Sequence, residues 1–512
     1  MTDLAALTSW NADWRGLRVA VLGLGVTGFT AADTLAELGA RVLVVASGAD
    51  PERRDLLGVI GAGYVETPGE EPPDELLDLD PQLVVVSPGY HPDHPLLLWA
   101  AARGIPVWGD IELAWRLRDK VLRADGTPAE WILITGTNGK TTTTQLTATM
   151  LVAGGLRAAP CGNIGVPVLD AIRDPQGFDA LVVELSSYQL HWMHRPGDPA
   201  GAIAPLAAVC LNLADDHYDW HGSARAYRDA KAKVYENVRI ACVYNLADAA
   251  TREMVEEADV QEGARAIGFG TGIPGPSDIG VVEGILVDRA FLDDRHRSAL
   301  ELATLDDLRE SGMIAPHAVA NVLAAAALAR AAGVAPAAIR DAVRGFRVDA
   351  HRTELVADVA GIRWVDDSKA TNAHAADAAL RAFESVVWIA GGQLKGVDPA
   401  PLVQAHAARL RAVILLGADR DLLRETFARH APGVLLIEVD EPETEGVMPA
   451  AVRAAASAAH PGDVVLLAPS AASFDQFTGY ADRGERFARA VREHLSEGGD
   501  AGDDDPTPAP PA

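Results

Sequence analysis

A glycine-rich loop that contains a lysine follows an apolar run in the first third of the chain. Residues 131–142 read Trp-Ile-Leu-Ile-Thr-Gly-Thr-Asn-Gly-Lys-Thr-Thr. The pattern predicts a strand, a turn at Gly136 and Gly139, and a helix that begins near Lys140. Loop N–H groups and the positive end of the helix would bind phosphate, and the Lys140 ammonium would reach the β- and γ-phosphates. The Lys-Thr-Thr sequence favours a nucleotide loop over an ordinary turn, with the Thr141 hydroxyl available to Mg²⁺.

A second glycine pattern, Gly-Leu-Gly-Val-Thr-Gly at residues 23–28, precedes the apolar run 42–45. Together they predict a βαβ unit with the turn of a dinucleotide site. Such a site expects an acidic residue after the second strand, whereas Ala46-Ser47 stands there, which disfavours NAD. The turn can instead hold a diphosphate, with Ser87-Pro-Gly89 at the end of another strand, or its glycines can serve only the turn. A nucleoside diphosphate fits both strand ends.

Acidic and histidine residues follow two further apolar runs. Glu184 ends the run 179–184, and His217 follows the run 208–212. Since parallel strands end at one edge of a sheet, these side chains should lie near the phosphate loop. A carboxylate and an imidazole there could bind a metal, although each taken singly is more often a satisfied surface group.

Polar residues also end the apolar runs of the last third of the chain. They are Asp-Asp-Ser-Lys-Ala-Thr-Asn at 366–372, Gly-Gly-Gln-Leu-Lys at 391–395 and Ala-Pro-Ser at 468–470. This repetition predicts a doubly wound α/β domain with one polar edge.

A length of 512 residues suggests about three domains. We expect an α/β protein with a Rossmann-like N-terminal domain, a central P-loop domain, a Rossmann-like C-terminal domain and a disordered acidic, proline-rich tail, at residues 1–112, 113–348, 349–497 and 498–512. A hinge is expected near residues 345–349.

The composition restricts the possible partners. Asp and Glu outnumber Lys and Arg by 72 to 44, and the net charge of −28 disfavours nucleic acid and anionic membranes. Cys161, Cys210 and Cys242 are too far apart in the sequence to indicate a disulfide framework or a zinc site. No basic-then-apolar leader and no apolar run of roughly 18 residues is present, so we expect a cytoplasmic protein without membrane insertion.

Several short motifs occur together and in order: Gly162-Asn-Ile-Gly165, Glu184-Leu-Ser-Ser-Tyr-Gln-Leu190, Asp216-His217, Lys231, His351-Arg352, Asp367-Ser-Lys-Ala-Thr-Asn372 and Ala472-Ser-Phe-Asp-Gln-Phe477. With them the chain resembles the Mur ligases from about residue 18 to about residue 491. The motifs at 367–372 and 472–477 are the most specific, because the whole superfamily, including folylpolyglutamate synthases, shares the phosphate loop.

The resemblance implies an ATP-dependent ligase of peptidoglycan precursor synthesis, whose partners are UDP-N-acetylmuramoyl-L-alanine and D-glutamate. The γ-phosphoryl group of ATP would pass to the alanyl carboxylate, the D-glutamate amine would attack the acyl phosphate, and phosphate would leave. The enzyme would be a monomer that positions these groups and neutralises their charge.

The resemblance also implies roles for individual residues. Lys140, Lys231, His217 and Lys369 would be catalytic. Thr141 and Glu184 would bind one Mg²⁺, and His217 with Lys231 a second. The residues expected to bind each substrate partly overlap with these. They are, for ATP, Gly136, Thr137, Asn138, Gly139, Lys140, Thr141, Thr142, Asn321, Arg352 and Asp367; for the UDP-linked substrate, Val26, Thr27, Ser87, Gly89, Asn163 and His217; and for D-glutamate, Thr371, Lys395, Ser473, Phe474 and Tyr480.

Three positions depart from the family pattern. Ala318 stands where relatives can have asparagine, which leaves the adenine contacts open, and Tyr480 stands where they can have phenylalanine. The missing acid after the second strand leaves the uracil contacts open.

Lys231 is expected to act as a carbamate. Helical spacing places it on one stripe with Tyr227, Val234 and Tyr235, while Lys233 points elsewhere. Burial disfavours an ammonium, and a neutral amine can take up CO₂ to become an anionic ligand for Mg²⁺. A lysine whose stem covers apolar surface while its head reaches solvent is the alternative, and the resemblance favours the carbamate.

Three other functions compete with this hypothesis. A folylpolyglutamate synthase also joins glutamate to a carboxylate, but it should lack the βαβ unit at residues 18–45. A nicotinamide dehydrogenase would not account for the phosphate loop at residues 136–142. A non-catalytic nucleotide-binding module does not need Glu184, His217 and Lys231 together.

Overall fold

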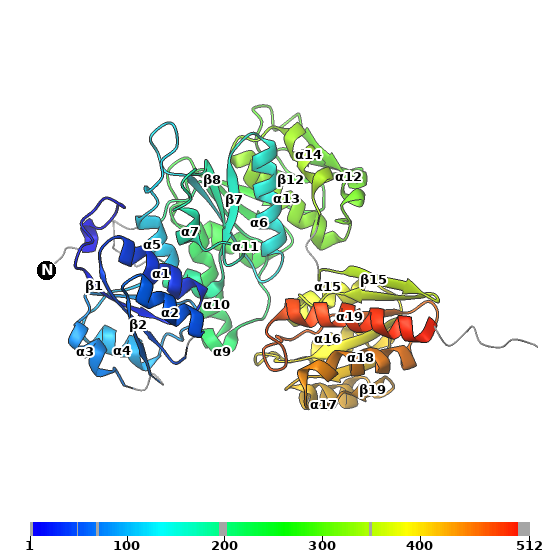
Figure 1. Cartoon of the computed structure of the whole chain (residues 1–512). Helices are drawn as coiled ribbons and strands as arrows, with labels where there is room; N and C mark the ends of the chain where they lie inside the picture. Colours follow the sequence, from blue (N-terminus) through cyan, green and yellow to red (C-terminus); the bar gives the residue numbers. More distant parts are fainter. Residues whose placement is uncertain (1–3, 49, 68–70, 194–201, 348–350, 500–512) are drawn as a thin grey trace, which may run out of the picture. The chain divides into compact units, whose positions relative to one another are not determined.

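The computed structural model describes residues 4–48, 50–67, 71–193, 202–347 and 351–499. The chain divides into two compact units. The first comprises residues 1–213 and 225–347, and the second comprises residues 214–224 and 348–512. Three sheets carry the fold, two in the first unit and one in the second (Figure 1).

The N-terminal sheet has five parallel strands in the order β3-β2-β1-β4-β5. Strands β1, β2 and β4 are almost wholly buried, as expected for parallel strands with helices on both faces. Its elements are η1 (Leu4–Ala6), β1 (Arg18–Leu22), α1 (Val26–Glu37), β2 (Arg41–Ala46), α2 (Pro51–Val59), β3 (Gly63–Glu66), α3 (Asp74–Leu79), β4 (Leu83–Val86), α4 (Pro95–Ala102), β5 (Val107–Gly109) and α5 (Asp110–Arg116).

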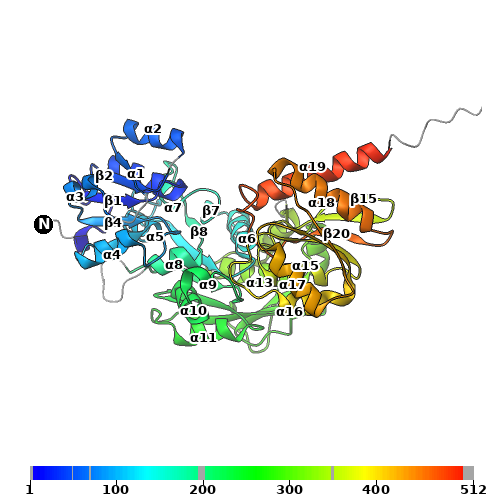
Figure 2. The ribbon, with the colours of Figure 1, turned by 90° about the horizontal axis from the view of Figure 1, so that it is seen from below.

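The central sheet has nine strands in the order β14-β13-β12-β11-β10-β9-β6-β8-β7, with β13 antiparallel to both neighbours. Helices α6 and α13 run side by side against it (Figure 2). The strands are β6 (Glu130–Thr135), β7 (Ala158–Gly162), β8 (Ala180–Glu184), β9 (Ala207–Cys210), β10 (Ala241–Asn245), β11 (Arg265–Phe269), β12 (Asp278–Val282), β13 (Ile285–Asp288) and β14 (Leu300–Thr304). The helices of this part are α6 (Lys140–Ala153), α7 (Val168–Ala171), α8 (Ser187–Trp192), α10 (Ala224–Ala232), η2 (Lys233–Tyr235), α11 (Ala249–Glu257), α12 (Leu305–Glu310), α13 (Pro316–Ala331) and α14 (Pro336–Gly345).

The second unit holds a six-stranded sheet in the order β15-β16-β20-β17-β18-β19, parallel except for β15. Helices α15, α16 and α17 bury one face, and α18 and α19 lie side by side on the other (Figure 1). The elements are α9 (Tyr218–His221), β15 (Glu354–Val359), β16 (Ile362–Asp366), α15 (Ala373–Arg381), β17 (Val386–Gly391), α16 (Ala400–His406), η3 (Ala407–Arg409), β18 (Leu410–Leu416), α17 (Arg420–His430), β19 (Leu435–Glu438), α18 (Thr444–Ala458), β20 (Val464–Leu467) and α19 (Tyr480–Gly499).

The predicted α/β class with three sheet-forming regions is confirmed, and the domain boundaries stay predictions. Residues 498 and 499, predicted as the start of a disordered tail, end helix α19 instead, and residues 500–512 lie outside the described part. Residues 348 and 349 of the expected hinge also lie outside it. No helix in the described part of the chain has the length and apolar character needed to cross a membrane.

A close backbone approach forms the turn between β1 and α1. A Cβ at position 28 would lie 2.0 Å from the Gly23 carbonyl oxygen, whereas a Cβ at Gly25 would meet no atom within 4 Å. Gly28→Ala should therefore displace α1 and lower the free energy of unfolding by about 1–3 kcal/mol, as overpacking does. Thermal unfolding measures this, and Gly25→Ala is the matched control. Equal melting temperatures of the two variants would contradict the packing argument.

Candidate active site

The phosphate loop joins the end of β6 to the start of α6. The backbone of Gly136 and Gly139 has φ of +148° and +84°, and α6 begins at Lys140, as predicted. The Lys140 ammonium donates to the carbonyl oxygens of Gly136 and Thr137, at 2.9 Å in both cases. The loop thus holds this positive charge against its own backbone, where a phosphate would bind.

Two asparagines from distant parts of the sequence reach this loop. A Cβ at position 139 would lie 2.5 Å from Oδ1 of Asn321, so the α13 side chain packs against the loop. The Asn138 N–H donates to Oδ1 of Asn212 at 2.8 Å, and Nδ2 of Asn212 donates to the Asn138 carbonyl at 3.0 Å. Asn321 was among the residues predicted for ATP. The contact of Asn212 with the loop was not predicted, because it depends on β9 being a neighbour of β6.

Lys231 is buried directly behind the loop. Its side chain lies on α10, the residue is 2% exposed, and Nζ donates to the Gly136 carbonyl at 2.9 Å and to Thr135 Oγ1 at 3.4 Å. The Tyr227 hydroxyl is 3.0 Å from Oγ1 of Thr137. The predicted stripe is correct, since Tyr227, Val234 and Tyr235 are buried with Lys231.

Lys233 points away from the loop, as predicted. Its ammonium donates to the carbonyl oxygens of His191 and Met193, at 2.8 and 3.1 Å. Burial lowers the pKa of Lys233, which the charge of Glu236 opposes. Lys231 and Lys233 therefore differ in their surroundings. Of these two, Lys231 donates to the phosphate loop, and Lys233 donates to the end of α8.

Glu184 ends β8, and the two oxygens of its buried carboxylate have different surroundings. The residue is 1% exposed, and Oε1 accepts a hydrogen bond from Asn163 Nδ2 at 2.9 Å. Within the described part of the chain, Oε2 is buried without a hydrogen-bond partner. Because a buried carboxylate oxygen without a partner is costly, this atom fits a cation ligand.

The turns after β1 and β4 meet at one edge of the N-terminal sheet. A Cβ at Gly23 would lie 2.7 Å from Ser87 Oγ, which is buried and has no hydrogen-bond partner among the described residues. Val26 is 52% exposed, and Thr27 is half-buried. The structure thus brings together the two strand ends that the sequence suggested for a diphosphate.

In the second unit, Arg352 and Asp367 face each other across a short loop. The Thr353 N–H donates to Oδ1 of Asp367 at 3.3 Å. Burial raises the pKa of Asp367 to about 7, and the positive charge of Arg352 opposes this rise. The imidazole of His351 lies 2.7 Å from Oδ2 of Asp366 and fixes the start of the loop.

The residues predicted for D-glutamate also lie in the second unit, around the ends of β16, β17 and β20. The Lys369 ammonium lies 4.7 Å from the centre of the Tyr480 ring. Ser473 is buried, whereas Phe474 is 74% exposed. The Tyr480 ring thus contacts a lysine of this group, while its contact with D-glutamate stays a prediction.

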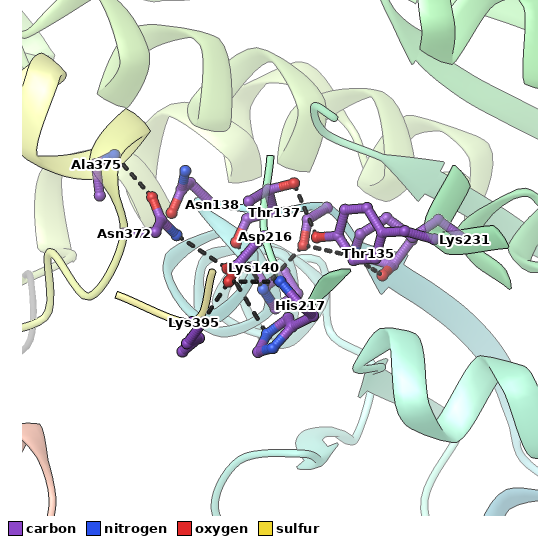
Figure 3. A network of polar contacts seen from close by, with 12 residues as sticks. Thr135, Thr137, Asn138, Lys140, Asp216, His217, Lys231, Asn372, Ala375 and Lys395 are labelled. Atoms are coloured by element: carbon purple, nitrogen blue, oxygen red, sulfur yellow. Dashed lines mark hydrogen bonds and ion pairs between the residues drawn. The ribbon is translucent and has the colours of Figure 1, made fainter. Parts of the chain in front are cut away.

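A carboxylate that the site prediction omitted lies beside these residues. Asp216 is buried, its Oδ1 is 3.3 Å from the Lys395 ammonium, and its Oδ2 accepts from Asn372 at 3.3 Å (Figure 3). The neighbouring His217 has φ of +55°, and its Nε2 lies 3.6 Å from Asp216. Lys395 therefore already pairs with a carboxylate in this structure, as a lysine for a dicarboxylate should be able to do.

The predicted site residues thus form two groups. Lys140, Glu184, Lys231 and Asn321 belong to the first unit, with the residues predicted for the UDP-linked substrate other than His217. His217, Arg352, Asp367 and the D-glutamate residues belong to the second.

Comparison with known proteins identifies the family. Three family models match the chain: the Mur ligase MurD-like N-terminal domain at residues 17–109, the Mur ligase middle domain at 134–329, and the Mur ligase glutamate ligase domain at 351–471. The chain belongs to the Mur ligase family. The UDP-N-acetylmuramoylalanine–D-glutamate ligase of Leifsonia xyli subsp. xyli is 67% identical over 502 residues, which cover 98% of this Mur ligase and 97% of the relative. The protein of the same name from Streptomyces avermitilis is 52% identical over 94% and 99% of the two chains.

Solved structures share the fold of this Mur ligase. The UDP-N-acetylmuramate-alanine ligase MurC from Thermotoga maritima has a TM-score of 0.53 at 18% identity and covers 94% of this chain and 99% of its own. The MurF ligase of Thermotoga maritima, in complex with ADP, has a TM-score of 0.53 at 17% identity and covers 97% and 100%. At such identities the likeness establishes the fold alone.

Gly139→Ala should weaken nucleotide binding by this Mur ligase. An alanine at φ +84° costs about 1–2 kcal/mol, and its Cβ would also push against Asn321. Calorimetric titration with ATP and Mg²⁺ should show a dissociation constant raised about tenfold or more, which corresponds to about 1.4 kcal/mol. Gly155→Ala is the control, since Gly155 has φ of +86° with no atom near its Cβ. Equal ATP affinity of both variants would contradict the loop geometry.

Proposed function

We propose that this chain is a UDP-N-acetylmuramoyl-L-alanine:D-glutamate ligase, which uses ATP to join the alanyl carboxylate to the amine of D-glutamate in peptidoglycan precursor synthesis. The observation that carries the proposal is the 67% identity, along almost the full length of both chains, to a relative with this name. The matched N-terminal domain at residues 17–109 argues against the folylpolyglutamate alternative, which should lack it.

The reaction needs the carboxylate to be activated. A carboxylate resists an amine because it is negatively charged and its oxygen is a poor leaving group. Transfer of the γ-phosphoryl group to a carboxylate oxygen gives ADP and an acyl phosphate. The D-glutamate amine then attacks the acyl carbon, the C–O bond to phosphate breaks, and the amine loses a proton as the amide forms. The protein supplies positioning and charge neutralisation.

The phosphate loop would supply both the positioning and the charge neutralisation that ATP needs. Residues 136–142 would bind the phosphates through their N–H groups, with the Lys140 ammonium neutralising the charge that develops during transfer. Asn321, which packs on the loop, would add a polar contact from α13. Arg352 and Asp367 would contact the same nucleotide from the second unit.

Several side chains of this protein are of the types that bind Mg²⁺, and the ion would shield the phosphate charges from each other and from the substrate carboxylate. The unpartnered Oε2 of Glu184 and the buried hydroxyl residue Thr141 would hold one ion. His217 and a carbamylated Lys231 would hold a second. Carbamylation joins the neutral Lys231 amine to CO₂ and releases one proton. The amine nitrogen, which donates hydrogen bonds, thus becomes part of an anionic carbamate whose oxygens can bind a metal.

The substrate contacts follow from the remaining side chains. Lys395, Thr371 and Ser473 offer an ammonium and hydroxyls to the two carboxylates of D-glutamate, with the Phe474 N–H and Tyr480 beside them. A substrate carboxylate would replace Asp216 at Lys395. Val26, Thr27, Ser87, Gly89, Asn163 and His217 would contact the UDP-linked substrate. Because the reaction would use ATP and a nucleotide-linked precursor, we propose that the enzyme acts in the cytoplasm. One chain carries every proposed contact, so we propose a monomer.

Phosphate release tests the proposed function. The protein is mixed with ATP, Mg²⁺ and UDP-N-acetylmuramoyl-L-alanine, with D-glutamate, L-glutamate or neither. We expect release only with D-glutamate, together with the amide product by mass spectrometry. Release with a folate and L-glutamate instead would favour the folylpolyglutamate alternative.

Lys140→Ala should lower turnover by about 100-fold or more, as loss of one charge-stabilising donor does. The fold should stay intact, because the Lys140 ammonium contacts loop carbonyls and not the apolar core. Steady-state phosphate release and circular dichroism measure the two effects. Near-normal turnover would show that the loop lysine does not stabilise the transferred phosphoryl group.

Lys231→Ala should lose activity that acetate or another short carboxylate partly restores, because the added carboxylate takes the place of the carbamate. Lys233→Ala is the matched control, and its activity should not respond to acetate. A fully active Lys231→Ala variant, or one that no carboxylate rescues, would contradict the carbamate.

A further inference from the structure

Arg483 is a wholly buried arginine in the first turn of α19. Its side chain is 0% exposed and ranks among the largest fully buried side chains of the protein. Among the described residues, no carboxylate lies within ion-pair distance of it. Burial lowers the pKa of Arg483 to about 10, which the more distant charges of Asp475 and Asp366 oppose. The guanidinium is therefore charged at neutral pH without a directly paired anion.

The guanidinium group instead donates to two backbone segments. Nη2 donates to the Ser368 carbonyl at 2.7 Å, and Nε donates to the Ser368 hydroxyl at 2.9 Å. Nη1 donates to the Ala471 carbonyl at 3.2 Å. The Ser368 hydroxyl in turn donates to the Tyr480 carbonyl at 2.7 Å. One side chain thus joins the loop after β16 to the loop after β20.

Both segments carry residues of the proposed D-glutamate site. Ser368 immediately precedes Lys369 in the first loop, and Ala471 lies two residues before Ser473 in the second. The second loop is also tied to the loop after β17, because Gln393 and Ala472 exchange two backbone hydrogen bonds of 2.9 Å. The contacts of Arg483 therefore extend, through Ala472 and Gln393, to the loop that carries Lys395.

The absence of a paired carboxylate argues against a role in stability alone. Burial of a charge costs several kcal/mol unless hydrogen bonds and a counter-charge offset it. An apolar side chain of similar volume would fill the same space without that cost. A planar group with donors in fixed directions, however, sets the separation of two loops in a way that an apolar chain does not.

We propose that Arg483 is a positioning residue for the amino-acid substrate, which sets the distance between the Lys369–Thr371 loop and the Ser473–Phe474 loop. This inference rests on the proposed function. The two carboxylates of a dicarboxylate amino acid are recognised by groups on both loops, so a shift of one loop relative to the other weakens recognition of that substrate. Asp367, next to Ser368, is one of the proposed ATP contacts. The phosphates of ATP and of the UDP-linked substrate would be bound by the first unit, however, so the KM values for these two substrates should change much less than the KM for D-glutamate.

Three variants test the proposal in the full-length enzyme. Arg483→Met removes the donors and keeps much of the volume, Arg483→Lys keeps the charge without the planar fork, and Ser368→Ala removes only the hydroxyl between Arg483 and Tyr480. Arg486→Met is the matched control one turn along α19, where the arginine pairs with Glu445 and Asp482 on the surface. The KM for each of the three substrates, kcat and the melting temperature are measured for all four.

We expect the KM for D-glutamate to rise about tenfold or more in both Arg483 variants, since small displacements of substrate-positioning groups have effects of this size. The KM values for ATP and the UDP-linked substrate should stay within about twofold. Ser368→Ala should show a smaller rise for D-glutamate alone, and Arg486→Met none. A fifth variant, Arg483→Ala, is measured with and without guanidinium ions at millimolar concentration, which should lower its raised KM for D-glutamate.

Two results would overturn the proposal. One is a D-glutamate KM within about twofold of the unchanged enzyme in the Arg483 variants, or in Ser368→Ala if those variants do not fold. The other is an equal rise of all three KM values with a lowered melting temperature and no response to guanidinium, as a purely structural arginine gives. If the unchanged enzyme shows no D-glutamate-dependent phosphate release, the proposed function fails instead, so the two failures are distinguishable.

Discussion

The carbonyl oxygen of Gly136 accepts hydrogen bonds from two lysines, Lys140 and Lys231, at 2.9 Å each. Two ammonium groups around one carbonyl oxygen would repel each other, and the burial of Lys231, where little water screens a charge, disfavours its ammonium form. A phosphate on one side of the loop and a carbamate on the other would convert this unfavourable arrangement into alternating charges. The proposed phosphate binding and the proposed metal chemistry both depend on this local balance.

The same balance explains how a chain with a net charge of −28 can act on anions. Its proposed substrates carry phosphates and carboxylates, so the overall field of the protein does not attract them. Each anion needs a local cation or a set of N–H donors: Lys140 and the start of α6 for ATP, and Lys369 and Lys395 for the dicarboxylate. In the second unit Asp216 and Asn372 keep Lys395 in place, and Arg483 ties together the loops around it.

Much of this arrangement was predictable from the sequence. Glycine loops after apolar runs indicated the strand–turn–helix units, because few other patterns allow a positive φ next to a helix start. Lys231 was predictable as buried because its helix has one apolar stripe. The contacts of Asn212 and Arg483 were not predictable, because they depend on which strands are neighbours and on how α19 packs across β15 and β16. Asp216 was visible beside His217, but its pairing with Lys395, 179 residues away, is a property of the folded unit.

The proposed mechanism requires ATP to activate the alanyl carboxylate by direct phosphoryl transfer, and an oxygen label tests this step. UDP-N-acetylmuramoyl-L-alanine labelled with ¹⁸O in both carboxylate oxygens is converted with ATP and D-glutamate, and the released phosphate is analysed by mass spectrometry. Direct transfer should leave one ¹⁸O atom in each phosphate formed, because the C–O bond of the acyl phosphate breaks when the amine attacks. Phosphate without ¹⁸O, formed in step with the amide product, would contradict it.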